Sequence, residues 1–93
     1  MIQHMYSIRD KKDGFSAIVP FISEVSSADE LAIRYFESHL KRTPIMNDNM
    51  EDFEICEIGT FDTISGTFMA DPKIHPKTIA KGADYIGNKN FTL

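Results

Sequence analysis

The sequence contains a single cysteine, no tryptophan and no long hydrophobic run. The lone Cys56 excludes an internal disulfide and a zinc site built from several cysteines, and it favours a reducing compartment. No apolar segment approaches the ~18 residues that a membrane helix needs, and the first residues lack the basic flank and apolar stretch of a signal peptide. We therefore expect one soluble domain over residues 1–93, in which the polar end, residues 88–93, is frayed.

Leucine is also scarce, with three residues against twelve isoleucines and seven phenylalanines. Isoleucine and phenylalanine favour the half-buried surface of a sheet, and a helical bundle of this length would carry more leucine and alanine. Strands are therefore expected to supply much of the core.

Lysine and arginine are absent from residues 43–71, which carry seven acidic side chains. Residues 72–93 instead carry four lysines and one acidic group, and residues 1–42 are balanced, so the formal net charge of the chain is −4. Three interpretations fit this asymmetry. The acidic middle pairs with the basic tail of another copy, a local basic surface lies on an acidic protein, or the charges simply form solvated faces.

Hydrophobic patterning predicts strands at the N-terminal end of the chain. Apolar and polar residues alternate over residues 2–9, which predicts a strand, and Asp13-Gly14 predicts a turn after it. Residues 15–22 are again apolar and β-branched. Because Pro20 lacks a backbone donor, this second run is expected to be an edge strand or an extended segment.

The sequence predicts a helix over residues 28–41. Apolar residues recur there at spacings of three and four, which gives one apolar face. Ser27 is the expected N-cap, with Glu30 completing a capping box, and Pro44 ends the helix.

The second half is expected to hold a polar loop over residues 44–52 and then a hairpin. Its first strand covers residues 53–61, with Phe53, Ile55 and Phe61 on one face, and residues 67–70 return as its partner. A short helix is predicted from Pro76 to Gly82.

Together these elements predict an α+β fold. A small, mostly antiparallel sheet of three to four strands carries the main helix on one face, and a short C-terminal helix follows. A sheet of this size leaves exposed edges that a second copy can cover, so a homodimer is expected.

No pattern typical of an active site or a metal site is present. The three histidines and Cys56 share no ligand spacing, and the five glycines are scattered rather than gathered in a phosphate loop. Glu54 and Glu57 are three positions apart, so on a strand they face opposite sides and cannot act as a pair. Acidic neighbours oppose a reactive thiolate at Cys56. We expect no enzyme activity, no cofactor and no metal.

Single-stranded nucleic acid requires cations for the phosphates and exposed aromatic rings for the bases. Arg9, Lys11 and Lys12 follow the first predicted strand, with aromatic rings on either side of the turn and in the next segment. The aromatic residues concerned are Tyr6, Phe15 and Phe21. The alternative is that these rings belong to the core and that the lysines only keep the turn soluble.

The chain opens with Tyr-Ser-Ile-Arg-Asp at residues 6–10 and later carries an acidic-aromatic strand, residues 52–62, that ends in Gly-Thr-Phe-Asp. Pro20-Phe21 and a helix segment with Ala32-Ile33-Arg34 and Phe36 lie between them, and Gly66 follows. These segments, in this order, resemble the small non-structural protein of the gokushovirus-type microviruses, tailless phages with circular single-stranded DNA genomes.

The resemblance implies a viral, non-structural role in the cytoplasm of the infected bacterium, without a cofactor and without catalytic residues. Such proteins are thought to bind single-stranded DNA, or to act when replication switches to single-strand synthesis and packaging. The family pattern coincides with Tyr6, Arg9 and Phe21.

The resulting hypothesis is a protein that binds single-stranded DNA without sequence preference. Bases would stack on Tyr6 and Phe21. Phosphates would contact Arg9, Lys11 and Lys12, helped by Arg34 or the tail lysines. The alternative is an interaction module that docks on a viral scaffold, a capsid or a host replication protein through acidic residues 48–57 or a sheet edge.

Overall fold

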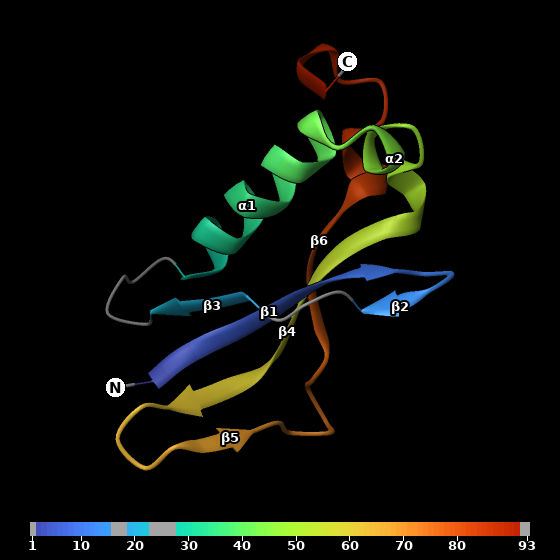
Figure 1. Cartoon of the computed structure of the whole chain (residues 1–93). Helices are drawn as coiled ribbons and strands as arrows, with labels where there is room; N and C mark the ends of the chain where they lie inside the picture. Colours follow the sequence, from blue (N-terminus) through green and yellow to red (C-terminus); the bar gives the residue numbers. More distant parts are fainter. Residues whose placement is uncertain (1, 16–18, 23–27, 92–93) are drawn as a thin grey trace.

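The computed structural model describes residues 2–15, 19–22 and 28–91. One antiparallel sheet forms its centre (Figure 1). The long strands β1 and β4 pair with each other; β2 and β3 pair with the other edge of β1, and β5 and β6 pair with the other edge of β4. The strands are β1 (Ile2–Asp10), β2 (Gly14–Phe15), β3 (Val19–Ile22), β4 (Phe53–Asp62), β5 (Thr67–Met69) and β6 (Lys77–Lys81).

The main helix α1 (Ala28–Arg42) packs on one face of this sheet, which confirms the predicted α+β fold. Its apolar stripe lies against side chains of β1 and β4, as the three- and four-residue spacing predicted. The expected cap Ser27 lies outside the described residues. The buried core consists of Tyr6, Ile8, Ala32, Phe36, Leu40, Met46, Phe53, Ile55 and Phe91.

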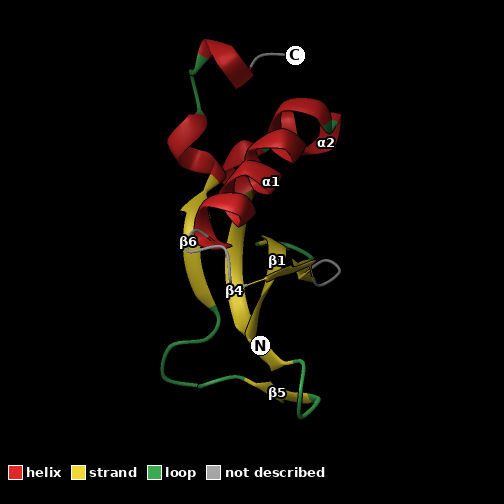
Figure 2. Ribbon diagram, turned by 90° about the vertical axis from the view of Figure 1, so that its left-hand side faces the viewer, coloured by secondary structure: helices red, strands yellow, loops and turns green. Residues whose placement is uncertain are grey.

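The sheet therefore has two different faces. We call the face that carries α1 the helix face and the opposite one the open face. In the described chain no α-helix packs on the open face, and the β4–β5 hairpin extends well away from the helices (Figure 2). No helix among the described residues is long and apolar enough to cross a membrane.

A β-bulge in the middle of the sheet corrects one predicted face. Tyr6 pairs with Glu57 but Met5 pairs with Gly59, so Ile58 is the extra residue. Because a bulge shifts the alternation by one residue, Phe61 moves to the face opposite Phe53. The predicted common face of Phe53, Ile55 and Phe61 is therefore wrong at Phe61.

The structure describes two parts of the second predicted strand, residues 15–22. Phe15 ends β2 and residues 19–22 form β3, and these strands pair with different parts of β1. Residues 16–18 lie outside the described residues. Pro20 lies in β3 at the edge of the sheet, as expected for a residue without a backbone donor. Residues 44–52 are not a simple loop, since they contain α2 (Pro44–Asn47) and the 3₁₀ helix η1 (Met50–Asp52).

The C-terminal segment differs most from the prediction. The expected helix from Pro76 to Gly82 is wrong, because β6 occupies this segment and aligns Ala80 with Ile55. Two 3₁₀ helices follow, η2 (Gly82–Tyr85) and η3 (Lys89–Phe91). Phe91, at the end of η3, is only 5% exposed and packs into the core.

Candidate nucleic-acid interface

The open face carries an apolar pocket of about 540 Å³. Two phenylalanines from opposite sides of the sheet, Phe15 of β2 and Phe68 of β5, contribute to its walls and are 48% and 47% exposed. Ring faces that stay accessible inside a concave site are suited to stacking. The pocket is lined by Ser7, Phe15, Ile58, Phe68, Ala70, His75 and Pro76.

Strand register and one close backbone approach place both rings. Phe15 lies opposite Arg9 in the β1–β2 pair, and Phe68 lies opposite Phe61 in the β4–β5 pair. The Phe68 ring packs over Gly59, where an added Cβ would lie 2.7 Å from the ring and 2.5 Å from the carbonyl oxygen of Met69. Only glycine leaves room for β5 at this distance.

Arg9 lies beside one wall of this pocket. Its guanidinium lies 5.6 Å from the centre of the Phe15 ring, within the range of a cation–π contact. The same side chain forms a 3.3 Å ion pair with the buried carboxylate of Glu54, and it remains 43% exposed. Lys81 lies opposite Glu54 on the other neighbouring strand. Arg9 therefore holds a buried carboxylate and also presents part of its charge beside an exposed ring.

The structure brings three of the predicted cations together and separates the fourth. Arg9, Lys11 and Lys12 lie at or near the β1–β2 turn, with the two lysines exposed. Lys12 pairs with Asp52 at 3.3 Å, but 73% of its side chain is accessible, so this contact is weakly held. Arg34 is exposed on α1, which covers the other face of the sheet, so it does not belong to this cluster.

Tyr6 requires a correction. It is 0% exposed on the helix face, and its hydroxyl donates a hydrogen bond to Asp29 of α1. A sealed ring cannot stack on a base, so the predicted stacking role of Tyr6 does not fit this structure. Phe21 lies in β3 with its backbone opposite His4, and its side chain is outside the described part of the chain.

The exposed rings that sequence reasoning missed are Phe68 and, in part, Phe15. The sequence places Phe15 beside the basic turn and Phe68 in a return strand, but it does not indicate that both rings line one pocket. Their meeting depends on the register of both outer strands and on the curvature of the sheet, which periodicity does not report. The one local signal was Gly59, since a glycine inside a strand often marks a close approach.

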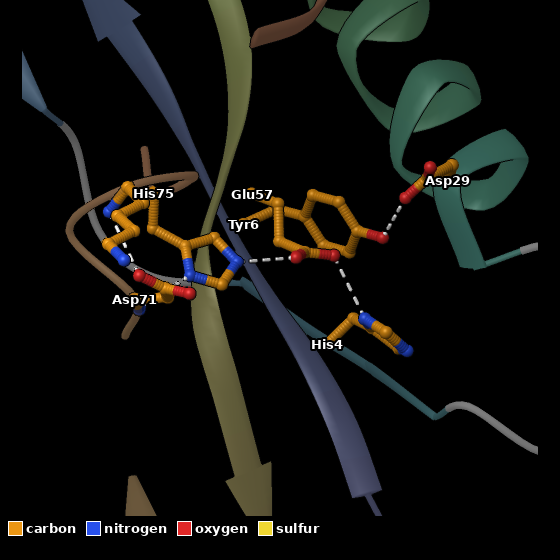
Figure 3. Close-up of polar contacts among 7 residues, drawn as sticks. His4, Tyr6, Asp29, Glu57, Asp71 and His75 are labelled. Carbon is orange, nitrogen blue, oxygen red and sulfur yellow. Dashed lines mark hydrogen bonds and ion pairs between the residues drawn. The ribbon is translucent and has the colours of Figure 1, made fainter. Parts of the chain in front are cut away.

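A polar cluster joins the pocket wall to the centre of the sheet (Figure 3). Glu57 contacts His75 Nε2 at 2.7 Å with one carboxylate oxygen and His4 Nδ1 at 2.9 Å with the other. The backbone N–H of Asp71 donates to His75 Nδ1 at 2.9 Å. Among the described residues no group of three or more histidine, cysteine or acidic side chains could hold a metal ion.

Several carboxylates of the acidic middle are occupied within the structure. Glu54 pairs with Arg9, Glu57 accepts from two histidines, and Asp52 pairs with Lys12. Asp62 accepts the backbone N–H groups of Ile64 and Ser65, which lowers the pKa of its carboxyl group. The negative surface is therefore smaller than the sequence suggested.

Cys56 also has a structural setting. It is buried in β4, its Sγ lies 3.6 Å from the hydroxyl of Thr78, and burial raises the pKa of its thiol. A raised pKa disfavours the nucleophilic thiolate. This agrees with the expectation that Cys56 is not a reactive thiolate.

A family model described as phage ORF5 protein matches residues 3–85. The chain belongs to the phage ORF5 protein family. The match spans β1 to η2 and so includes the whole pocket of this ORF5 protein. The expected origin in a phage is thereby confirmed at the level of the family. No curated protein and no solved structure matches the chain.

Proposed function

We propose that this phage ORF5 protein binds single-stranded DNA without sequence preference. It would act in the cytoplasm of the infected bacterium, during genome replication of a gokushovirus-type microvirus or in the switch to single-strand synthesis and packaging. One observation carries the proposal: two half-exposed phenylalanines line one pocket on the open face, and a guanidinium lies beside one of them.

The shape of the pocket favours single strands over a duplex. Phe15 and Phe68 expose ring surface within a concavity rather than on a flat surface. Bases of a single strand can turn into such a site and stack, at about 1–3 kcal/mol for each base, whereas stacked base pairs would first have to open. The site is therefore a stacking site for unpaired bases.

The polar groups in the pocket explain why no base should be preferred. Both ring nitrogens of His75 already have partners, and the hydroxyl of Ser7 lies 3.4 Å from the carbonyl oxygen of Ile8. The other lining residues are phenylalanine, isoleucine, alanine and proline, which have no polar side-chain atoms. Specific readout requires donors and acceptors aimed at base edges, so stacking should dominate.

Electrostatics should make this binding moderate. The basic turn supplies Lys11 and Lys12 and part of the charge of Arg9, against a formal net charge of −4 for the whole chain. A few phosphate contacts on an acidic protein give an affinity that falls with salt. We expect measurable binding at low ionic strength and weak binding at physiological salt.

The test is titration of fluorescent oligo-dT with the full chain, together with Phe15→Ala and Phe68→Ala. Each substitution should weaken binding by about 1–3 kcal/mol, which is roughly fivefold to 150-fold in Kd, because one stacking surface is lost. Ile64→Ala is the matched control, since Ile64 is an exposed apolar residue at the hairpin turn and does not line the pocket.

Two results would overturn the proposal. One is the absence of oligo-dT binding by the wild-type protein at low salt. The other is equal affinity of the wild type for oligo-dT and for a duplex of the same length, since stacking on the two rings requires unpaired bases.

The second candidate is docking on a viral or host protein through residues 48–57. A small groove near this segment favours it, because exposed Ile45 lies there beside the carboxylates of Asp10 and Asp13. Asp52 also lines the groove and pairs there with Lys12. A partner with basic and apolar side chains would complement it. Recovery of one protein with this chain after nuclease treatment, lost in Ile45→Glu, would favour this function over DNA binding.

A further inference from the structure

We infer that Glu57 and His75 form a positioning pair that holds residues 70–76 in place as one wall of the DNA pocket. This inference rests on the proposed function and extends it. The affinity for single-stranded DNA would depend on a partly buried contact whose side chains touch no DNA phosphate. The pair acts by fixing the wall before DNA arrives.

The segment concerned lacks strand pairing of its own. β5 ends at Met69 and β6 begins at Lys77, and between them Ala70, His75 and Pro76 contribute to the pocket. Within this connection, a turn closes where the backbone N–H groups of Ile74 and His75 donate to the Asp71 carbonyl at 3.0 and 2.7 Å. These bonds shape the turn but do not tie it to the sheet.

His75 makes that tie. Its side chain is only 8% exposed, and its Nε2 lies 2.7 Å from Glu57 Oε1 of the central strand β4. On the other side of the ring, Nδ1 accepts the backbone N–H of Asp71 at 2.9 Å. The imidazole therefore connects the turn on one side to the sheet on the other (Figure 3).

The hydrogen-bond partners fix the role of each nitrogen. A ring nitrogen that accepts a backbone N–H carries no proton, so the proton of neutral His75 lies on Nε2 and is donated to Glu57. Such a charge-assisted bond is among the stronger protein hydrogen bonds. The second oxygen of Glu57 contacts His4 of β1, which keeps the carboxylate in place but does not reach the wall.

A fixed wall matters because a loose one must be ordered at the moment of binding. Ordering side chains and loops costs binding free energy, and a site that is already formed avoids this cost. Loss of the His75 contact should therefore weaken DNA binding even though the stacking rings are intact. It should also expose the Asp71 amide to exchange with solvent.

The experiment compares His75→Ala, His75→Gln and His4→Ala with the wild type, all as full chains. The readouts are oligo-dT affinity, the melting temperature and hydrogen exchange at the Asp71 amide. We expect His75→Ala to lower affinity about tenfold and to speed this exchange. His4→Ala is the matched control, because it removes the other imidazole from the same carboxylate and should change affinity less than twofold.

His75→Gln separates positioning from a general loss of stability. Its side-chain amide can still donate to Glu57, so it should recover much of the affinity lost in His75→Ala. Should His75→Ala fail to fold, Glu57→Gln gives the same comparison with a smaller perturbation, since it keeps the volume and weakens both histidine contacts.

The outcomes distinguish a failure of the positioning role from a failure of the proposed function. If the wild type binds oligo-dT but His75→Ala binds as well as the wild type, the positioning role is wrong and the proposed function stands. The positioning role would also be wrong if His75→Ala and His4→Ala lost the same affinity and each loss followed the decrease in melting temperature. If the wild type binds no oligo-dT, both the proposed function and this inference fail.

Discussion

Whether a single side chain is buried depends on partners from other elements, which the sequence does not show. Tyr6 was expected to be an exposed stacking ring, yet it is a core residue whose hydroxyl reaches Asp29 at the start of α1. A tyrosine can be buried when its polar end finds a partner, and here the partner comes from another element. The position on an alternating strand did not reveal which face would be covered.

Buried Tyr6 and partly buried Tyr85 predict how stability depends on alkaline pH. Burial, and next the hydrogen bond to Asp29, raise the pKa of Tyr6 above its ordinary range. Burial also raises the pKa of Tyr85 to about 12, followed by a hydrogen bond to Glu37. In the unfolded chain both phenols ionise near pH ~10, so above that pH the unfolded state holds fewer protons than the folded state.

The free energy of unfolding should therefore fall between pH 10 and 12. The expected slope is about 1.4 kcal/mol per pH unit for each of the two tyrosines. Urea denaturation at several alkaline pH values measures it. Tyr6→Phe should remove about half of the slope and Tyr6→Phe with Tyr85→Phe nearly all of it. An unchanged slope in Tyr6→Phe would show that the phenol is not protected in the folded state.

Site residues that lie close together in the chain were predictable from the sequence, and those that lie far apart were not. The basic turn with Arg9, Lys11 and Lys12 was found because three cations lie close together in the chain. Phe15 and Phe68 are more than fifty residues apart and meet only through two hairpin registers. Hydrophobic periodicity therefore could not predict that these two rings line the same pocket.

At the scale of elements, the helix and the central strands were predictable and the connections were not. The α1 prediction over residues 28–41 differs from the structure by one residue, because its apolar spacing has no competing pattern. The segment after Pro76 is short, and its threonine and isoleucine suit a strand as well as a helix turn. In the structure this segment pairs with β4 and therefore forms the strand β6 rather than a helix.

Close packing between the short helices gives a prediction at this scale. Gly82 opens η2 against η1, and an added Cβ would lie 2.1 Å from the carbonyl oxygen of Met50. Gly82→Ala should therefore force the two 3₁₀ helices apart and lower the free energy of unfolding by about 3 kcal/mol, as for an overpacked core.

Gly87→Ala provides the control for this substitution. Gly87 has a φ of 84°, with nothing within 4 Å of an added Cβ, so its replacement should cost only about 1 kcal/mol of backbone strain. Urea denaturation of both variants makes the comparison. An equal cost at the two positions would mean that η2 moves away from η1 without a penalty.

At the scale of the whole molecule, the protein is acidic, but several of its carboxylates are paired within the fold. Carboxylates of the middle segment are occupied by Arg9, Lys12, two histidines and backbone N–H groups. Lys11 makes no ion pair with the described residues, and it lies at the turn next to β2. A moderately acidic chain can thus present positive charge beside its stacking rings. The predicted homodimer stays a prediction.

This arrangement predicts a shallow salt dependence for DNA binding. Each phosphate neutralised on a single strand contributes a slope of about −0.7 to the plot of log K against log salt. If Arg9, Lys11 and Lys12 each contact one phosphate, the slope for oligo-dT should be about −2. Titrations at several salt concentrations give this value directly.

Lys11→Ala should reduce the magnitude of the slope by about 0.7 without changing the melting temperature, because Lys11 is exposed and forms no ion pair with the described residues. Lys89→Ala is the matched control. Lys89 lies in η3, at the opposite end of the molecule from β5, and its loss should leave the slope unchanged (Figure 1). If both lysines shifted the slope equally, DNA would be responding to net charge alone. The basic turn would then have no particular part in recognition.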